Sequence, residues 1–301
     1  AFAVLAIGYA ARAIGSFIFG HIGDRIGRKP VLILSVLLMG GGSLALACLP
    51  TYDQIGISAT ILLVAIRILQ GISVAGEYTA SAVLIVEQAP RERRAFIGSF
   101  VPFAMLMGCV LGAAVPAALS SVLNDDQMAA WGWRLPFLLG AVVAVFGAIL
   151  RRHLVESEAM SDADKSGPSP VVQAITGHWR LILQMVLLLL PTAVIYFMIF
   201  VYAASYLTSE MHISSAKALD ITTLNLLVMA LAAPVYGWLA DRFGLRAVFL
   251  TAAIASVLFA APLWGLMHHD SLVMIYLGQL GLALINAAAW ALSVTALASM
   301  T

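Results

Sequence analysis

The sequence predicts an all-α membrane protein made of two similar helical bundles, and three observations support this. Of its 301 residues, 62% are hydrophobic and only 10% are charged, whereas soluble domains have about 25% charged residues. Apolar stretches recur along the chain at about 20 residues, the length that crosses a hydrocarbon core of roughly 30 Å. A short charged segment also occurs twice, once in each half. The composition excludes a soluble domain, and the repeat indicates two copies of one helical module.

Nine apolar runs are long enough to span a bilayer. They lie at 1–19, 31–49, 56–86, 96–118, 134–150, 180–207, 217–239, 247–267 and 272–298. The polar segment that follows the fifth run contains S-D-A-D-K-S-G-P-S-P, which is a linker composition. We therefore expect an N-terminal bundle at 1–150, a cytoplasmic linker at 151–179 and a C-terminal bundle at 180–301.

The repeated segment reads G-H-I-G-D-R-I-G-R-K at 20–29 and G-W-L-A-D-R-F-G-L-R at 237–246. Four residue types recur at matching offsets, namely Gly20, Asp24, Arg25 and Gly27, then Gly237, Asp241, Arg242 and Gly244. The second copy follows the second run of its half, but the first copy follows the first run. We therefore expect one further span before residue 1 and, for equal halves, two after residue 301, so that nine of twelve spans are present.

Basic residues are distributed unevenly between the two sides of the predicted bundle. Twelve fall on one side, namely Arg25, Arg28, Lys29, Arg91, Arg93, Arg94, Arg151, Arg152, Lys165, Arg180, Arg242 and Arg246. The other side has Arg134 and Lys217, and the remaining two, Arg12 and Arg67, lie inside spans. The side with twelve basic residues is predicted to be cytoplasmic by the positive-inside rule.

Several motifs resemble those of a known family. The charged segment at 20–29 resembles the signature between spans two and three of the major facilitator superfamily, and L-V-A-I-R-I-L-Q-G-I-S-V-A resembles its fourth-span motif. More specific are Q-G-I-S-V-A-G-E-Y-T-A-S, R-E-R-R, W-G-W-R-L-P-F and L-R-R-H-L-V-E-S, which occur in that order at 70–81, 91–94, 131–137 and 150–157. Together they resemble the metabolite:proton symporter family, which includes the proline/betaine transporter and the α-ketoglutarate and citrate permeases.

This resemblance implies a major facilitator fold with two pseudo-symmetric bundles, placed as a multi-pass protein in the bacterial inner membrane. It implies secondary active transport by alternating access, in which a small organic acid or zwitterion moves together with a proton. In the resembling superfamily the charged hairpins also lock the halves on the cytoplasmic side. The residues to which this gating role transfers are Asp24, Arg25, Gly27, Arg28, Lys29, Asp241, Arg242 and Arg246. The alternative is that they are ordinary charges of a cytoplasmic loop.

A polar stripe marks the predicted fourth span. Arg67, Gln70 and Glu77 fall within one arc of the helix at 100° per residue. Because an ionisable group that faces lipid costs at least about 2.5–3.5 kcal/mol, this arc is predicted to face the bundle interior or a cavity. Arg67 and Glu77 are ten residues apart, about 15 Å, so each needs another partner. We expect Arg12 to be that partner for Glu77.

Two functional hypotheses follow for these residues. Glu77 exchanges a proton for an arginine, which would couple transport to protons. Alternatively, Arg12 or Arg67 binds a substrate carboxylate, because guanidinium binds carboxylate with two hydrogen bonds. The structural alternative is a buried ion pair that fixes helix register. The predicted substrate and coupling set is Arg12, Arg67, Gln70, Glu77 and Tyr78.

The second half carries no charge deep in a span. Its candidates for lining a cavity are Tyr196, Tyr202, Asn225 and Asn286. Amides inside spans are more often interhelical contacts, and tyrosines near span ends are more often interface anchors.

The remaining expectations concern function class and partners. An intramembrane hydrolase is disfavoured, because Ser73 has no intramembrane His as a base and no pair of deep aspartates exists. We expect no enzyme activity, no cofactor, no metal and no nucleic acid, and a monomer in a lipid bilayer whose partners are a small molecule and a proton. A uniporter, a transporter-like sensor and an inactive fragment remain the alternatives.

Overall fold

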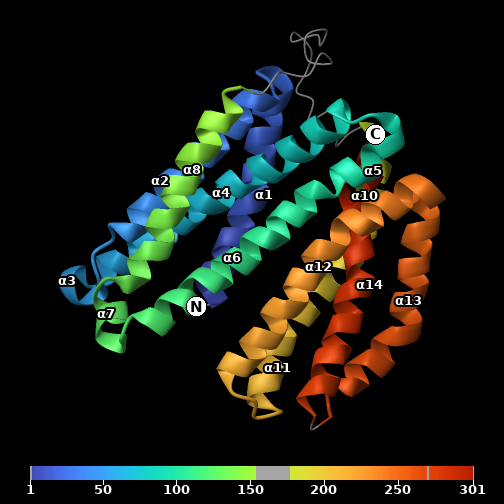
Figure 1. The fold of residues 1–301 in the computed structure, drawn as a ribbon. Coiled ribbons are helices and arrows are strands. Elements are labelled where there is room, and N and C mark those ends of the chain that lie inside the picture. Colours follow the sequence, from blue (N-terminus) through green and yellow to red (C-terminus); the bar gives the residue numbers. More distant parts are fainter. Residues whose placement is uncertain (1, 154–176, 270, 301) are drawn as a thin grey trace. The chain divides into compact units, whose positions relative to one another are not determined.

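The computed structural model describes residues 2–153, 177–269 and 271–300, and the regular structure in these ranges is helical (Figure 1). Most of the predicted linker therefore lies outside the described residues. Eight helical stretches within these ranges are long and apolar enough to cross a membrane. They match the second to ninth apolar runs, and the first run forms the 24-residue helix α1 (Phe2–Arg25).

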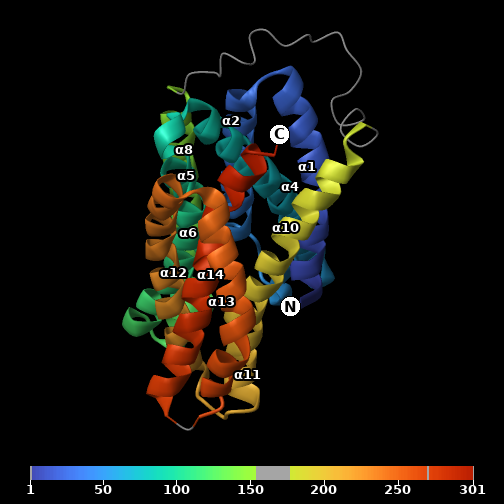
Figure 2. The same cartoon turned by 90° about the vertical axis from the view of Figure 1, so that its right-hand side faces the viewer.

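The chain divides into two compact units, of which the first comprises residues 1–87 and 114–178. Its helices are α1, α2 (Arg28–Ala47), α3 (Tyr52–Ile55), α4 (Ile57–Gln88), the second part of α6 (Phe100–Val122), α7 (Asp125–Ala130) and α8 (Leu135–Arg151). Helices α2 and α8 lie side by side in both views (Figures 1 and 2). Val36, Ala144 and Ala148 are buried together where these two helices meet. Small residues at such contacts let helix backbones approach closely.

The second unit comprises residues 88–113 and 179–301. It holds α5 (Arg94–Gly98), the first part of α6, α10 (Trp179–Phe197), α11 (Ala203–Ser209), α12 (Ser215–Phe243), α13 (Leu245–Leu266) and α14 (Leu272–Ala298). Helix α14 packs along both α12 and α13 (Figure 2). Buried alanines, namely Ala230, Ala233, Ala283, Ala287 and Ala291, form much of its core. Residues 88–113, which the sequence assigns to the N-terminal bundle, group here, and the predicted bundle boundaries stay a prediction.

The helices suit a lipid environment for a physical reason. Helices satisfy most of their backbone hydrogen bonds internally, as the hydrocarbon region requires. Large apolar side chains remain exposed on the outer faces, and Val257 on α13 is 82% exposed. An apolar surface of this kind is stable against lipid tails, which agrees with the predicted membrane environment.

Candidate functional site

The first unit contains a cavity of about 680 Å³ that two arginines line. Its walls come from α1, α2, α4 and α8, and the lining residues are Gly8, Tyr9, Arg12, Met39, Ser43, Leu63, Arg67, Gln70, Gly71, Val74 and Phe137. The predicted residues Arg12, Arg67 and Gln70 therefore meet at one place. Ligand pockets commonly measure about 300–1,000 Å³, so this cavity is large enough for a small metabolite.

Hydrogen bonds hold one wall of this cavity in place. Arg67 donates from Nη1 to Gln70 Oε1 at 3.2 Å, and Gln70 Nε2 donates to Ser43 Oγ at 3.4 Å. Gln70 is buried, whereas Arg67 is exposed. The amide of Gln70 thus orients the guanidinium, and this one hydrogen bond uses only one of the five N–H donors of Arg67.

Arg12 occupies the α1 side of the cavity. Its guanidinium lies over the ring of Tyr9, 4.8 Å from the centroid, in a cation–π contact. Its Nε atom is buried and has no hydrogen-bond partner among the described residues. None of the described residues that line the cavity is acidic, so this lining carries two positive charges. The cavity therefore suits a ligand with a carboxylate.

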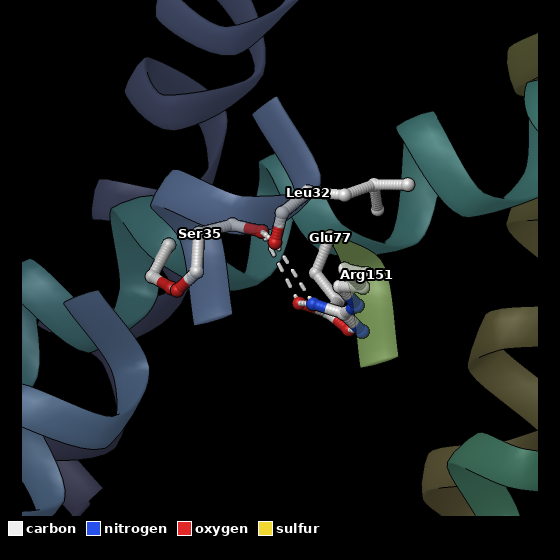
Figure 3. A network of polar contacts seen from close by, with 5 residues as sticks. Leu32, Ser35, Glu77 and Arg151 are labelled. Carbon is white, nitrogen blue, oxygen red and sulfur yellow. Dashed lines mark hydrogen bonds and ion pairs between the residues drawn. The ribbon is translucent and has the colours of Figure 1, made fainter. Parts of the chain in front are cut away.

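Glu77 takes part in a separate polar cluster, shown in Figure 3. Arg151, at the end of α8, binds both carboxylate oxygens of Glu77, one of them from Nη1 at 2.9 Å. The same Nη1 donates to the carbonyl oxygen of Leu32 at 2.9 Å, and Ser35 Oγ donates to Glu77 Oε2 at 3.2 Å. The Glu77 side chain is 35% exposed and that of Arg151 is 20% exposed. The ion pair joins α4 to α8, and the hydrogen bonds of Leu32 and Ser35 connect α2 to both.

The expectation that Arg12 pairs with Glu77 is wrong, and helix packing explains why. Helix α1 packs on α4 with Gly8 and Ala11 close to Gly71. Arg12 is consequently level with Gly71, whereas Glu77 lies six residues, about 9 Å, further along α4. Arg151 was missed as its partner. The only sequence signals were that Arg151 ends an apolar run and begins the R-R-H-L-V-E-S part of a quoted motif. Tyr78 is half-buried beside Glu77 and does not line the cavity.

Both charged hairpins form the expected tight turns between helices. Gly27 separates α1 from α2 with a φ of 122°, and Gly244 separates α12 from α13 with a φ of 92°. Such positive φ angles strain residues that carry a Cβ, which explains glycine at both positions. The sequence repeat therefore corresponds to a repeated backbone turn.

The two hairpin aspartates make different contacts. Asp24 forms an ion pair with Arg28 at 3.1 Å, one turn along the chain. Asp241 instead accepts hydrogen bonds from the backbone N–H groups of Ala95 and Phe96, at 2.9 and 2.8 Å. These N–H groups begin α5 and have no partner within the helix, so the carboxylate satisfies them. Asp241 thereby fixes α12 to the segment that precedes α6.

The other predicted gating residues lie around these turns. Arg25, Arg242 and Arg246 are exposed, and Lys29 is half-buried. Arg242 lies 5.6 Å from the ring centroids of both Trp238 and Phe243. A smaller cavity of about 380 Å³ adjoins Asp241 and Arg242. The gating role of this set stays a prediction.

In the second unit a buried polar network joins three helical segments. Asn225 on α12 donates to Gln279 Oε1 on α14 at 3.1 Å. Gln279 donates in turn to the carbonyl oxygen of Ile199 at 2.6 Å and to Thr222 Oγ1 at 3.5 Å. Ile199 belongs to a π-helical stretch, Met198–Tyr202, between α10 and α11. Asn225 is 0% exposed, and this geometry favours its interhelical alternative over cavity lining.

The other three candidates of the second half differ from one another. Asn286 on α14 is 2% exposed, and neither of its amide atoms has a partner among the described residues. Tyr196 stacks on Trp290, with ring centroids 4.9 Å apart. Tyr202 is exposed and stacks on Trp264 at 6.1 Å. Trp290 lies one turn from Asn286 on the same helix, α14.

A multi-span helical protein with a repeated charged hairpin and a cavity lined by arginines has the features of a membrane transporter. The chain belongs to the Major Facilitator Superfamily, whose family profile matches residues 1–219 and 192–301. The predicted fold, the superfamily and the multi-pass membrane location are therefore confirmed, and this superfamily consists of transporters and not enzymes.

Relatives support the same assignment. The chain is 34% identical over 297 residues to the glycine betaine/proline/ectoine/pipecolic acid transporter OusA of Dickeya dadantii, covering 95% of this chain and 59% of that protein. It is 34% identical over 289 residues to the shikimate transporter of Escherichia coli, covering 94% and 66%. Its fold resembles a solved structure of the proton:xylose symporter XylE, with a TM-score of 0.69, 18% identity, and coverage of 96% and 70%. The chain thus spans about three fifths of the length of the first of these relatives.

Proposed function

We propose that this chain belongs to a secondary active transporter that carries a small organic acid or zwitterion together with a proton across the bacterial inner membrane. The observation that carries this proposal is the cavity of the first unit, which has Arg12 and Arg67 in its wall and no acidic residue among its described lining. Membership of a transporter superfamily supports the transport step, and the named relatives carry carboxylates such as betaine, proline and shikimate.

The two arginines account for binding of the carboxylate. A guanidinium inside a membrane protein costs several kcal/mol unless another group compensates its charge. Protein groups compensate Arg67 only in part, through Gln70, and Arg12 Nε has none. A substrate carboxylate accepts two parallel hydrogen bonds from one guanidinium and supplies the missing charge. Binding of the substrate therefore satisfies groups that the protein alone leaves without partners.

Glu77 accounts for coupling to protons in this proposal. Its carboxylate has two alternative partners, the guanidinium of Arg151 and a proton. When a proton neutralises Glu77, the ion pair that joins α4 to α8 loses its charge attraction. Helix contacts at this level then loosen, which links protonation to movement of the helices. The hairpins around Asp24 and Asp241 serve as cytoplasmic gates, supported by the contact of Asp241 with the start of α5.

Uptake into proteoliposomes tests this proposal, with the full-length protein that contains this sequence. Labelled shikimate, proline and glycine betaine are offered with and without an inward proton gradient. We expect gradient-driven accumulation of at least one of them by the wild type. Glu77→Gln should lose accumulation and keep exchange of pre-loaded substrate, because its side chain cannot release a proton. Arg67→Gln should raise KM by about tenfold or more, because it removes a charge-assisted contact.

The other outcomes identify the alternatives. Flux that never exceeds equilibrium indicates a uniporter, and binding with no flux indicates a sensor. Uphill uptake by Glu77→Gln removes Glu77 from the coupling mechanism. Unchanged kinetics in both Arg12→Lys and Arg67→Gln would assign the arginines to packing alone.

A further inference from the structure

We propose that Asn286 and Trp290 on α14 form a hydrogen-bonding subsite for a hydroxyl group of the transported solute. This inference rests on the proposed transport function and specifies the class of solute further. Asn286 is 2% exposed, and both its Oδ1 and its Nδ2 are buried without a hydrogen-bond partner among the described residues. Trp290 Nε1 is likewise buried and has no partner in the described part of the chain. The two residues are four apart, so their side chains lie on the same side of α14.

A comparison along the same helix separates this pair from ordinary interhelical contacts. Gln279 lies seven residues, or two turns, before Asn286 and therefore on the same face. Gln279 is 0% exposed and binds Asn225, Thr222 and the carbonyl oxygen of Ile199. One buried amide of this face is thus used fully by the protein, and the next is not used at all. Buried amides without partners are costly and rare, so a ligand is the simplest source of partners for Asn286.

The contacts around the pair hold it in a fixed geometry. The ring of Trp290 stacks on Tyr196 of α10 with an interplanar angle of 18°, which restricts rotation of the indole. Asn286 is flanked on α14 by Ala287 and Ala288, both buried at 1% exposure or less. Polar groups held by packing in this way are preorganised, which lowers the entropic cost of binding. In alternating access, movements of the helices expose such a buried pair to solute in another state of the cycle.

The donors and acceptors of the pair specify the chemistry of the ligand. Asn286 offers one acceptor and two N–H donors, and the indole of Trp290 offers one N–H donor. A hydroxyl is complementary to both, because it donates to Asn286 Oδ1 while its oxygen accepts from Trp290. A trimethylammonium group makes no hydrogen bond, and a carboxylate leaves Oδ1 without a donor. The subsite therefore favours a hydroxylated acid over a betaine.

Equilibrium binding to the full-length protein in detergent tests this subsite. The probes are shikimate and cyclohexenecarboxylate, which share a ring and a carboxylate and differ in hydroxyl groups. We expect the wild type to bind shikimate about tenfold more tightly or better. Asn286→Leu and Trp290→Phe should each reduce that ratio severalfold and leave binding of cyclohexenecarboxylate unchanged, because only contacts to hydroxyls are lost. Trp290→Phe keeps an aromatic ring stacked on Tyr196, so this variant still tests the subsite if Asn286→Leu does not fold.

Thr222→Val provides the matched control, because Thr222 is a hydrogen-bond partner of Gln279 and not of Asn286 or Trp290. It should lower the melting temperature and leave the ratio at its wild-type value. Equal binding of the two acids by the wild type, or a ratio that neither α14 variant changes, overturns the subsite. Preference for shikimate without any uptake would instead contradict the proposed transport and leave the subsite standing. Uptake without preference would contradict the subsite alone.

Discussion

At the scale of single residues, the pair of Glu77 and Arg151 joins α4 to α8. Removing one partner leaves the other charge without compensation, which costs about 3–5 kcal/mol in a fully buried pair. Because Glu77 is 35% exposed, we expect roughly 1–3 kcal/mol for Arg151→Gln. The double variant Glu77→Arg with Arg151→Glu should recover part of this loss, since the opposite charges are restored. Thermal unfolding in detergent measures both, and a double variant less stable than either single change would contradict the pairing.

The same residues show what the sequence could and could not reveal about the site. Arg67 and Gln70 were predicted to share a face because one helix contains both, and helical geometry places them. The cost of burying Arg12 likewise indicated that it lies inside a bundle. The partner of Glu77 depends instead on the depth at which α1, α2 and α8 pack against α4. That depth is set by contacts such as Gly8 and Ala11 against Gly71, which no local pattern encodes.

At the scale of helices and turns, Gly20 and Gly237 are equivalent in the repeat, but their surroundings differ. A Cβ on Gly237 would lie 2.6 Å from Ser99 Oγ and 2.7 Å from the carbonyl oxygen of Ala95. A Cβ on Gly20 would have no neighbour within 4 Å in the described part of the chain. We expect Gly237→Ala to destabilise the protein by about 1–3 kcal/mol and to disturb the contact of Asp241 with α5. Gly20→Ala should be neutral or stabilise by up to about 1 kcal/mol through helix propensity. Melting temperatures compare the two, and equal shifts would contradict the close packing of α12 on α5.

Helix positions were the best predicted part of the fold, for a direct physical reason. The bilayer requires long apolar segments with internal hydrogen bonds, so hydropathy alone locates the helices. The turns at Gly27 and Gly244 were predictable because the required φ angles favour glycine. The network of Asn225 with Gln279 was not predictable, since these residues are 54 positions apart and their contact depends on how α12 packs against α14.

At the scale of the whole molecule, the distribution of basic residues determines orientation in the membrane. Twelve Lys and Arg fall on the side of the two charged hairpins and two fall on the opposite side. Because basic loops stay in the cytoplasm, both hairpins should face inward. The connection between α6 and α8, in which Asp125 is the first residue of α7, should face outward. The two native cysteines, Cys48 and Cys109, are exposed and are replaced by serine before labelling.

Single cysteines at Arg25, Arg242 and Asp125 then measure this orientation in intact cells with a membrane-impermeant thiol reagent. We expect the variant at Asp125 to be labelled from outside, and those at Arg25 and Arg242 only after the cells are permeabilised. Equal behaviour of Arg25 and Arg242 is essential, because the repeat places an even number of spans between the hairpins. Labelling of the two positions from opposite sides would contradict the duplicated topology, and with it the alternating-access mechanism that depends on two equivalent bundles.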